Sequence, residues 1–183
     1  MSGNIVSRIF GVLILAILVM VPVCHAADFT ARDGLAKAEK AAAAWHADAA
    51  LTAVRTTSLK ADGKAAVWQY DYLSLENSIC ARVLIIGGGD ARLQDMGKCT
   101  PAKPVPETFV DSPDMLKAAV AAGFKPDETA NAYLIIESDS AAKDKACWVT
   151  FTSADFDQEN AAMRGWCVDP GTGKFLVRLS GHN

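Results

Sequence analysis

The sequence predicts an α+β protein built from two αββββ repeats, each with one helix packed on a four-stranded antiparallel sheet. Two helical segments, one alanine-rich and one following a proline-rich stretch, are each followed by four short segments with strand character. Trp68 and Trp148 fall in the second strand segment of each half. Because a sheet with one apolar face needs a cover, one helix per repeat would complete each layer.

The chain begins with the three parts of a secretory signal peptide. Arg8 precedes an apolar run over residues 9–23, and Cys24 and Ala26 are the small residues of a cleavage site. The run is shorter than the roughly 20 residues of a membrane-spanning helix. We therefore predict that residues 1–26 are a cleaved signal peptide. An uncleaved anchor and lipidation at Cys24 are the alternatives.

The first repeat is predicted over residues 27–100. Thr30 and Asp33 have the spacing of a capping box, and the alanine-rich segment over residues 34–51 favours a helix. The turn at Asp62-Gly63 and the glycine run at residues 87–89 separate the strands that follow. These strands are expected over residues 51–58, 65–74, 79–86 and 91–96.

Residues 101–111 are the predicted linker, because the prolines between residues 101 and 113 resist both helix and central strand. The second repeat follows over residues 112–183. Ser112 is the expected cap of its helix, with Pro113 in the first turn and Gly123 at the end. Its strands are expected over residues 132–138, 146–153, 165–169 and 174–179.

Four cysteines remain after residue 26, and an even number in an exported chain indicates disulfides. Three pairings are possible. We favour Cys80–Cys99 and Cys147–Cys167, because each pair would bridge neighbouring antiparallel strands. The pairings between repeats are the alternatives. No Cys-x-x-Cys motif occurs, and the later histidines lie far from any cysteine pair, so no metal site is predicted.

Short motifs in the second half resemble the PepSY and PepSY-like domains of exported bacterial proteins. The matching segments are Ala118–Gly123, Lys145–Val149 and Val168–Lys174, which correspond to the helix, the tryptophan strand and the Val-Asp-x-x-Thr-Gly hairpin of those domains. The tandem layout also looks like that of secreted β-lactamase inhibitor proteins. The resemblance implies a binding or inhibitory module of the cell envelope, in some cases acting on peptidases. It carries over no catalytic residue.

The first half is similar in fewer places. Trp45–Leu51, Asp62–Ala65 and Trp68–Tyr70 follow the same order of helix, turn and tryptophan strand. The first half departs from the pattern at Gly87–Asp90, where the Asp-x-x-Thr-Gly hairpin is replaced by a glycine run. The two halves together cover nearly all of the chain after residue 26.

Aromatic side chains are the candidate binding residues, because rigid aromatics are typical interface anchors. They are Trp68, Tyr70, Tyr72, Trp148 and Trp166. The alternative is that these rings lie in the core and pack under the helices. In that case the opposite sheet face carries Gln69, Asp71, Thr150 and Thr152, a polar surface without evident chemistry.

The charge balance argues against nucleic acid as a partner. Arg8 is the only charged residue before Asp28, so 17 basic and 21 acidic side chains follow residue 26, a formal net charge of −4. Nucleic-acid binding and polybasic membrane sites both require a basic face. No later segment is long and apolar enough to span a bilayer, so no stable membrane insertion is predicted after cleavage.

No catalytic arrangement of residues is evident, and we predict neither enzyme activity nor a cofactor. The expected function is that of a periplasmic or secreted binding module with a protein partner in the cell envelope. Inhibition of a peptidase or another exported enzyme would fit such a module. The alternative is a periplasmic carrier of a small molecule or an ion.

Overall fold

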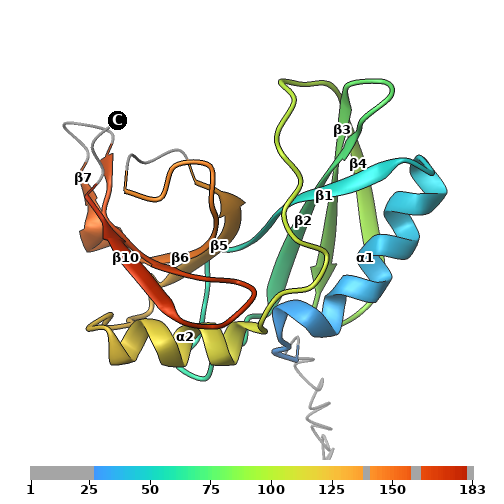
Figure 1. The fold of residues 1–183 in the computed structure, drawn as a ribbon. Helices are drawn as coiled ribbons and strands as arrows, with labels where there is room; N and C mark the ends of the chain where they lie inside the picture. The colour runs from blue at the N-terminus through green and yellow to red at the C-terminus, as the bar shows by residue number, and fades with distance from the viewer. Residues whose placement is uncertain (1–26, 138–140, 158–161, 181–183) are drawn as a thin grey trace, which may run out of the picture.

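The computed structural model describes residues 27–137, 141–157 and 162–180. The predicted signal peptide over residues 1–26 lies outside these ranges. Within them, no helix is long and apolar enough to cross a membrane. The described residues contain two α-helices and ten strands (Figure 1).

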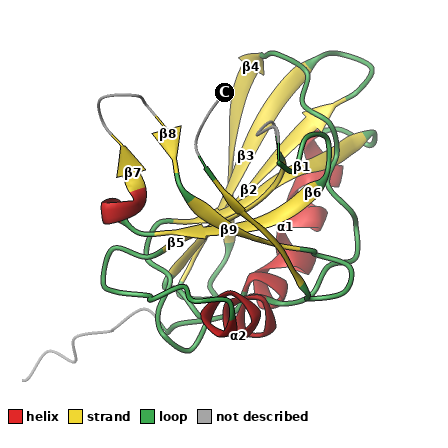
Figure 2. Ribbon diagram, turned by 60° about the vertical axis from the view of Figure 1, so that its left-hand side comes forward, coloured by secondary structure: helices red, strands yellow, loops and turns green. Residues whose placement is uncertain are grey.

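Eight of the strands form one continuous antiparallel sheet in the order β10-β9-β6-β5-β1-β2-β3-β4. Their bounds are Ala49–Thr56 (β1), Val67–Ser74 (β2), Ile79–Ile86 (β3), Ala91–Lys98 (β4), Asn131–Ile136 (β5), Ala146–Phe151 (β6), Gly165–Val168 (β9) and Phe175–Leu179 (β10). The other two, β7 (Phe156–Asp157) and β8 (Ala162–Met163), form a short hairpin beside the sheet (Figure 2). A 3-10 turn, η1 (Ser153–Asp155), precedes that hairpin.

The predicted fold class is wrong in one decisive respect. Two separate αββββ repeats would each have their own four-stranded sheet, whereas here β1 pairs with β5 and the strands form a single sheet. Val54, Arg55 and Thr56 lie opposite Leu134, Tyr133 and Ala132. An edge strand has unpaired N–H and C=O groups, and the β1–β5 contact satisfies those of two strands at once.

Helix α1 (Ala31–Trp45) begins as predicted and ends earlier than predicted. Thr30 and Asp33 form the capping box, in which the Asp33 backbone N–H donates to Thr30 Oγ1 and the Thr30 N–H to Asp33 Oδ2. The helix ends at Trp45, and Ala49 already belongs to β1. Alanine favours a helix wherever it stands, so the alanine-rich run after Trp45 did not reveal the boundary.

Small residues let α1 lie close to the sheet. Its buried positions are Ala31, Gly34, Ala38 and Ala42. A Cβ atom at Gly34 would lie 2.4 Å from Tyr70 Oη, a distance that real Cβ contacts essentially never show. The helix packs against β1, β2, β3 and β4. Helix α2 (Ser112–Ala121) packs against β6 and β9.

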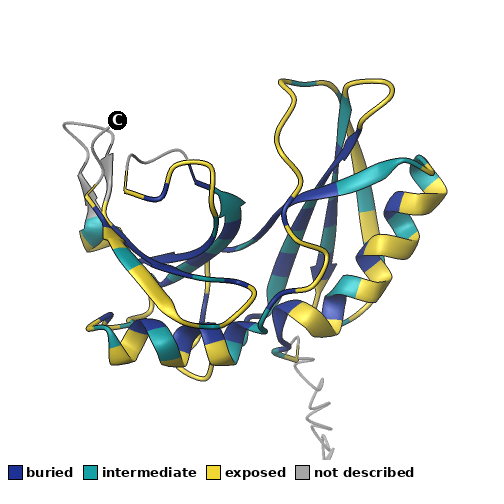
Figure 3. Cartoon of the chain, in the orientation of Figure 1, coloured by how far each residue is buried: buried dark blue, intermediate teal, exposed yellow. Residues whose placement is uncertain are grey.

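The main core lies between the two helices and one face of the sheet (Figure 3). Trp68 on β2 meets Trp148 on β6 edge-to-face, with 6.2 Å between ring centroids. Val105 and Phe109 come from the predicted linker but are buried in the same core. Phe109 contacts the Trp148 ring at 5.6 Å, so the proline-rich segment fills part of the helix layer instead of running through solvent.

Both predicted disulfide pairings are present. Cys80 and Cys99 have an S–S distance of 1.94 Å, and Cys147 and Cys167 have one of 1.95 Å. The second disulfide is fully buried on the sheet face away from the helices. It belongs to a smaller apolar cluster with Ala142, Val149, Phe151 and Leu179.

The N-termini of the two helices meet and share their capping groups. Asp111, the N-cap of α2, accepts hydrogen bonds at Oδ1 from the backbone N–H groups of Ser112 (2.8 Å) and of Arg32 in α1 (3.0 Å). The buried Ser112 Oγ accepts from the Ala31 N–H at 3.1 Å. The last two hydrogen bonds join residues that are 79 and 81 positions apart in the sequence. They satisfy backbone N–H groups that the start of a helix leaves without a partner in the helix.

Replacing Asp111 with alanine is expected to lower the free energy of unfolding by about 1–2 kcal/mol, because both helices lose a capping acceptor. Asp111→Asn keeps an acceptor oxygen at the same place and is the matched control, with an expected change of a few tenths of a kcal/mol. Urea denaturation of the three proteins measures both values. Equal losses in the alanine and asparagine variants would mean that the charge of Asp111, not its acceptor, stabilises the junction.

Candidate functional site

The sheet face away from the helices is the best candidate for a functional surface. We call the part of this face on β1, β2, β3, β4 and β5 the open face. Successive side chains of a strand alternate between the two faces, and directly paired residues share a face. With the aromatic residues of β2 in the core, the register assigns to the open face Arg55, Val67, Gln69, Asp71, Arg82, Leu84, Ile86, Arg92, Gln94 and Tyr133.

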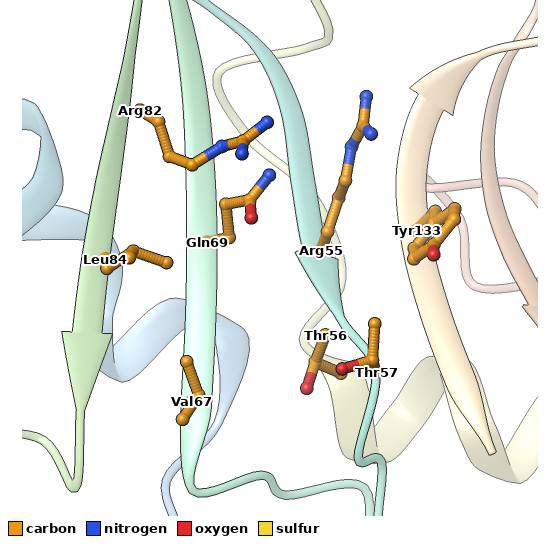
Figure 4. A pocket seen from close by; sticks show the side chains of 8 residues that line it. All are labelled: Arg55, Thr56, Thr57, Val67, Gln69, Arg82, Leu84 and Tyr133. Atoms are coloured by element: carbon orange, nitrogen blue, oxygen red, sulfur yellow. The ribbon is translucent and has the colours of Figure 1, made fainter. Parts of the chain in front are cut away.

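One row of paired residues crosses the middle of the open face. Gln69 lies between Leu84 and Arg55, and Arg55 lies between Gln69 and Tyr133. Figure 4 shows these four side chains next to one another on four neighbouring strands. Three of the strands, β1, β2 and β3, come from the first half of the chain and the fourth is β5, so the row exists only because β1 and β5 are paired.

Asp71 holds two arginines from the strands on either side of its own. Arg82 Nε donates to Asp71 Oδ1 at 3.1 Å. Arg55 Nε lies 3.3 Å from Asp71 Oδ2, an ion pair without hydrogen-bond geometry. Gln69 Nε2 donates to both oxygens of the same carboxylate, at 3.0 and 3.2 Å. Asp71 is more buried than either arginine, with 17% of its side chain exposed, against 41% for Arg55 and 34% for Arg82.

The guanidinium groups are held at Nε and are free at their outer ends. The Arg55 Nε atom is itself buried, so the exposed part of this side chain is its distal end. Its guanidinium carbon also lies 5.5 Å from the centroid of the Tyr133 ring, a cation–π contact. Tyr133 in turn packs edge-to-face on Phe151 at 5.0 Å. No Nη atom of Arg55 or Arg82 has a hydrogen-bond acceptor in the part of the chain that the structure describes.

Two hollows adjoin these arginines. The first has a volume of about 240 Å³ and is lined by Arg55, Thr56, Thr57, Val67, Gln69, Arg82, Leu84 and Tyr133 (Figure 4). The second, of about 410 Å³, also includes Arg55 and extends along Ile135 to Lys103 and Asp144. Lys103 and Asp144 form an exposed ion pair at 2.6 Å. Arg55 thus stands between two adjoining depressions.

The five aromatic residues that sequence analysis proposed for binding lie in the core. Trp68, Tyr70, Tyr72, Trp148 and Trp166 are each at most 6% exposed. Four of them donate hydrogen bonds to backbone carbonyls: Trp68 Nε1 to Phe29, Tyr70 Oη to Ala31, Trp148 Nε1 to Val110 and Trp166 Nε1 to Ala122. Of the two alternatives, packing under the helices is the arrangement found, and these rings form no accessible docking surface.

The polar residues expected opposite those rings divide between the two faces. Gln69 and Asp71 lie on the open face, as predicted from the alternation in β2. Thr150 is fully buried and pairs with Trp166, so it shares the face of Trp148. Thr152 is also buried, and its Oγ1 donates to Asp155 Oδ2 at 2.9 Å. The prediction was wrong for Thr150 because residues two apart in a strand point to the same side.

Arg55, Arg82 and Tyr133 are not among the binding residues predicted from the sequence. Arg82 is the one charged residue in the apolar segment over residues 79–86, which could have placed its side chain opposite the core. Nothing local to residues 51–58 or 132–138 indicates that Arg55 and Tyr133 are neighbours. Among the described residues, no cluster of three or more His, Cys, Asp or Glu side chains could hold a metal ion.

Burial raises the pKa of both Tyr70 and Tyr72 well above the ordinary value of a tyrosine. A tyrosine whose pKa is higher in the folded than in the unfolded protein stabilises the fold at pH values below its unfolded pKa of about 10. This stabilisation is lost as the pH rises above that value. Tyr72 Oη has no hydrogen-bond partner, so Tyr72→Phe removes the ionisable group without breaking a bond.

We therefore expect Tyr72→Phe to leave stability at neutral pH nearly unchanged and to reduce the loss of stability above about pH 10. Urea denaturation at a series of alkaline pH values, with tyrosinate absorbance followed in parallel, measures this. If wild type and variant lost stability with the same slope, ionisation of Tyr72 would not be coupled to unfolding.

No protein-family model, curated protein or solved structure matches this chain. The resemblance to PepSY-like domains stays a prediction from the motifs.

Proposed function

We propose that this protein is a non-enzymatic, exported binding module that docks on a protein partner through its open face. The observation that carries the proposal is the pair of arginines at Asp71, whose outer N–H groups have no acceptor within the described chain. Arginine is enriched at protein interfaces and at binding hot spots. The neighbouring Val67, Leu84 and Ile86 add apolar surface of the kind that interface centres contain.

The scaffold around these residues suits a preformed binding surface. Sites on strands are held more rigidly than sites on loops, and a rigid surface loses less entropy on binding. Four strands of the open face, β5, β1, β2 and β3, are interior strands of an eight-stranded sheet, and β4 is its edge. Cys80–Cys99 fastens β3 to the segment after β4, and Cys147–Cys167 fastens β6 to β9.

Export is the second part of the proposal. Disulfides persist in oxidising compartments and are rare in the cytoplasm. The two disulfides therefore support a periplasmic or extracellular location, together with the signal peptide predicted over residues 1–26. The resemblance of the motifs to PepSY-like domains favours an exported enzyme, such as a peptidase, as the partner that is bound and inhibited.

Site-specific photo-crosslinking in the producing cell tests the docking face. A photo-reactive amino acid is placed at Gln94 or Thr57, which are exposed beside the arginines, and at Lys40 or Lys117 on the helices as controls. We expect a discrete protein adduct from the first two positions, abolished by Arg55→Glu. Adducts from the helix positions alone, or from all four positions equally, would contradict the proposal.

A further inference from the structure

The arginine cluster of the open face indicates which chemical group of the partner it binds. We propose that Arg55 and Arg82 together form a subsite for a single carboxylate, supplied by an aspartate or glutamate side chain of the docked protein. This inference rests on the proposed function, since it names the group that the docking face recognises. Three observations support it: the N–H donors of the two arginines, the net charge of their cluster with Asp71, and the size of the neighbouring hollow.

The donors are present and oriented. A guanidinium has five N–H groups in a planar fork that matches the geometry of a carboxylate. Each arginine has its Nε close to Asp71: Arg82 Nε donates at 3.1 Å, and Arg55 Nε lies at 3.3 Å without hydrogen-bond geometry. Figure 4 shows both guanidinium groups on the same side of the sheet and toward the same end of the cluster. Their Nη groups are therefore positioned for one further acceptor.

The charge of the cluster is matched by one carboxylate. Two guanidinium groups and the Asp71 carboxylate leave a net charge of +1. Arg92, paired with Leu84 on β4, adds a further positive charge to the open face. The neighbouring hollow contains Lys103, Lys143, Asp144 and Glu137, and its Lys103–Asp144 pair is internally neutral. This positive patch lies on a chain whose formal net charge is −3.

Asp71 also distinguishes a carboxylate from phosphate. A phosphate group carries about 1.5 to 2 negative charges at neutral pH. Its charge would exceed the net +1 that Asp71 leaves on the two arginines, and uncompensated negative charge in a partly buried site is unfavourable. A monovalent carboxylate neutralises the cluster without an excess of negative charge.

The size and lining of the hollow fit one side chain. Its volume of about 240 Å³ lies below the ~300–1,000 Å³ of typical small-molecule sites. Val67 and Leu84 form one wall and the Tyr133 ring lies beyond Arg55 (Figure 4). The methylene groups of a glutamate could pack on these apolar atoms while its carboxylate reaches the Nη groups.

Two blocked amino acids that differ in one group test the subsite: N-acetyl-glutamate methylamide and N-acetyl-glutamine methylamide. Each is titrated at constant ionic strength into the oxidised protein lacking residues 1–26, and the Nε–Hε resonances of the arginines are followed by NMR. We expect saturable shifts at Arg55 and Arg82 with the glutamate probe only. Arg55→Gln and Arg82→Gln should each weaken that binding about tenfold.

Arg32→Gln is the matched control, because Arg32 is exposed on α1 and the same charge is removed away from the site. Its expected effect on binding is less than twofold. Equal shifts with both probes, shifts that spread equally to Arg32, or tighter binding of inorganic phosphate than of the glutamate probe would each overturn the carboxylate assignment. These shifts are measured on the wild-type protein and do not depend on the folding of a variant.

The outcome is separable from that of the docking proposal. Saturable glutamate binding without any adduct from Gln94 or Thr57 would leave a carboxylate site that serves no docking. Adducts from those positions that survive Arg55→Gln and Arg82→Gln would mean that the open face docks a partner through other residues.

Discussion

Replacing Trp68 with alanine is expected to lower the free energy of unfolding by about 3–5 kcal/mol, the largest effect of any single change considered for this chain. The ring is fully buried and packs edge-to-face on Trp148. Its Nε1 donates to the Phe29 carbonyl at 2.8 Å, so truncation leaves a cavity and removes one of the two hydrogen bonds that this carbonyl accepts, the other coming from the Ala65 N–H. Urea denaturation followed by circular dichroism measures the loss.

Two controls separate these contributions. Trp68→Phe retains much of the packing and loses the hydrogen bond, and we expect about 1–3 kcal/mol from it. Trp45→Ala removes a half-buried tryptophan of α1, and its cost should be well below that of Trp68→Ala. A loss below about 1 kcal/mol for Trp68→Ala would mean that the centre of the sheet is not packed as described.

The Trp68–Trp148 contact also tests the single sheet. The two rings come from strands β2 and β6, on opposite sides of the β1–β5 junction. A double-mutant cycle with Trp68→Ala and Trp148→Ala should give a coupling energy of about 0.5–1.5 kcal/mol. Unfolding should remain one transition. Additive losses together with two separate transitions would indicate that the halves fold independently.

The second large effect is expected from the buried disulfide. Cys147→Ala/Cys167→Ala should lower the free energy of unfolding by about 3 kcal/mol through the loop-closure contribution of its 20-residue separation. Because both cysteines are fully buried in the second apolar cluster, lost packing adds to this cost. Thermal and urea denaturation of the oxidised variant measure the total.

The other disulfide is a matched control. Cys80 and Cys99 are 19 residues apart, so the chain-entropy contribution is nearly the same. Their side chains are only partly buried, and Cys80→Ala/Cys99→Ala should therefore cost less. Mild reduction of the native protein followed by alkylation and mass spectrometry should modify Cys80 and Cys99 first. Preferential modification of Cys147 and Cys167 would contradict the burial described here.

Local sequence patterns were sufficient to predict the two helices, the eight strands of the sheet and the favoured disulfide pairing. The capping pair Thr30 and Asp33 marked the start of α1, strand alternation located β2 within two residues of its observed bounds, and β3 has the bounds predicted for it. These features depend on hydrogen bonds and side-chain directions within a short segment. Alternation also put Trp68, Tyr70 and Tyr72 together on one face, although it did not say whether helix or solvent covers that face.

What the sequence determined by itself was the two helices, the eight strands of the sheet, the favoured cysteine pairing and the segregation of the β2 aromatics from Gln69 and Asp71. Only the tertiary structure decided that β1 pairs with β5, and hence that there is one sheet instead of two. The physical reason is that strand pairing between segments about 80 residues apart depends on register and edge hydrogen bonds, which no local pattern encodes. That pairing places Arg55 between Gln69 and Tyr133 and completes the open face.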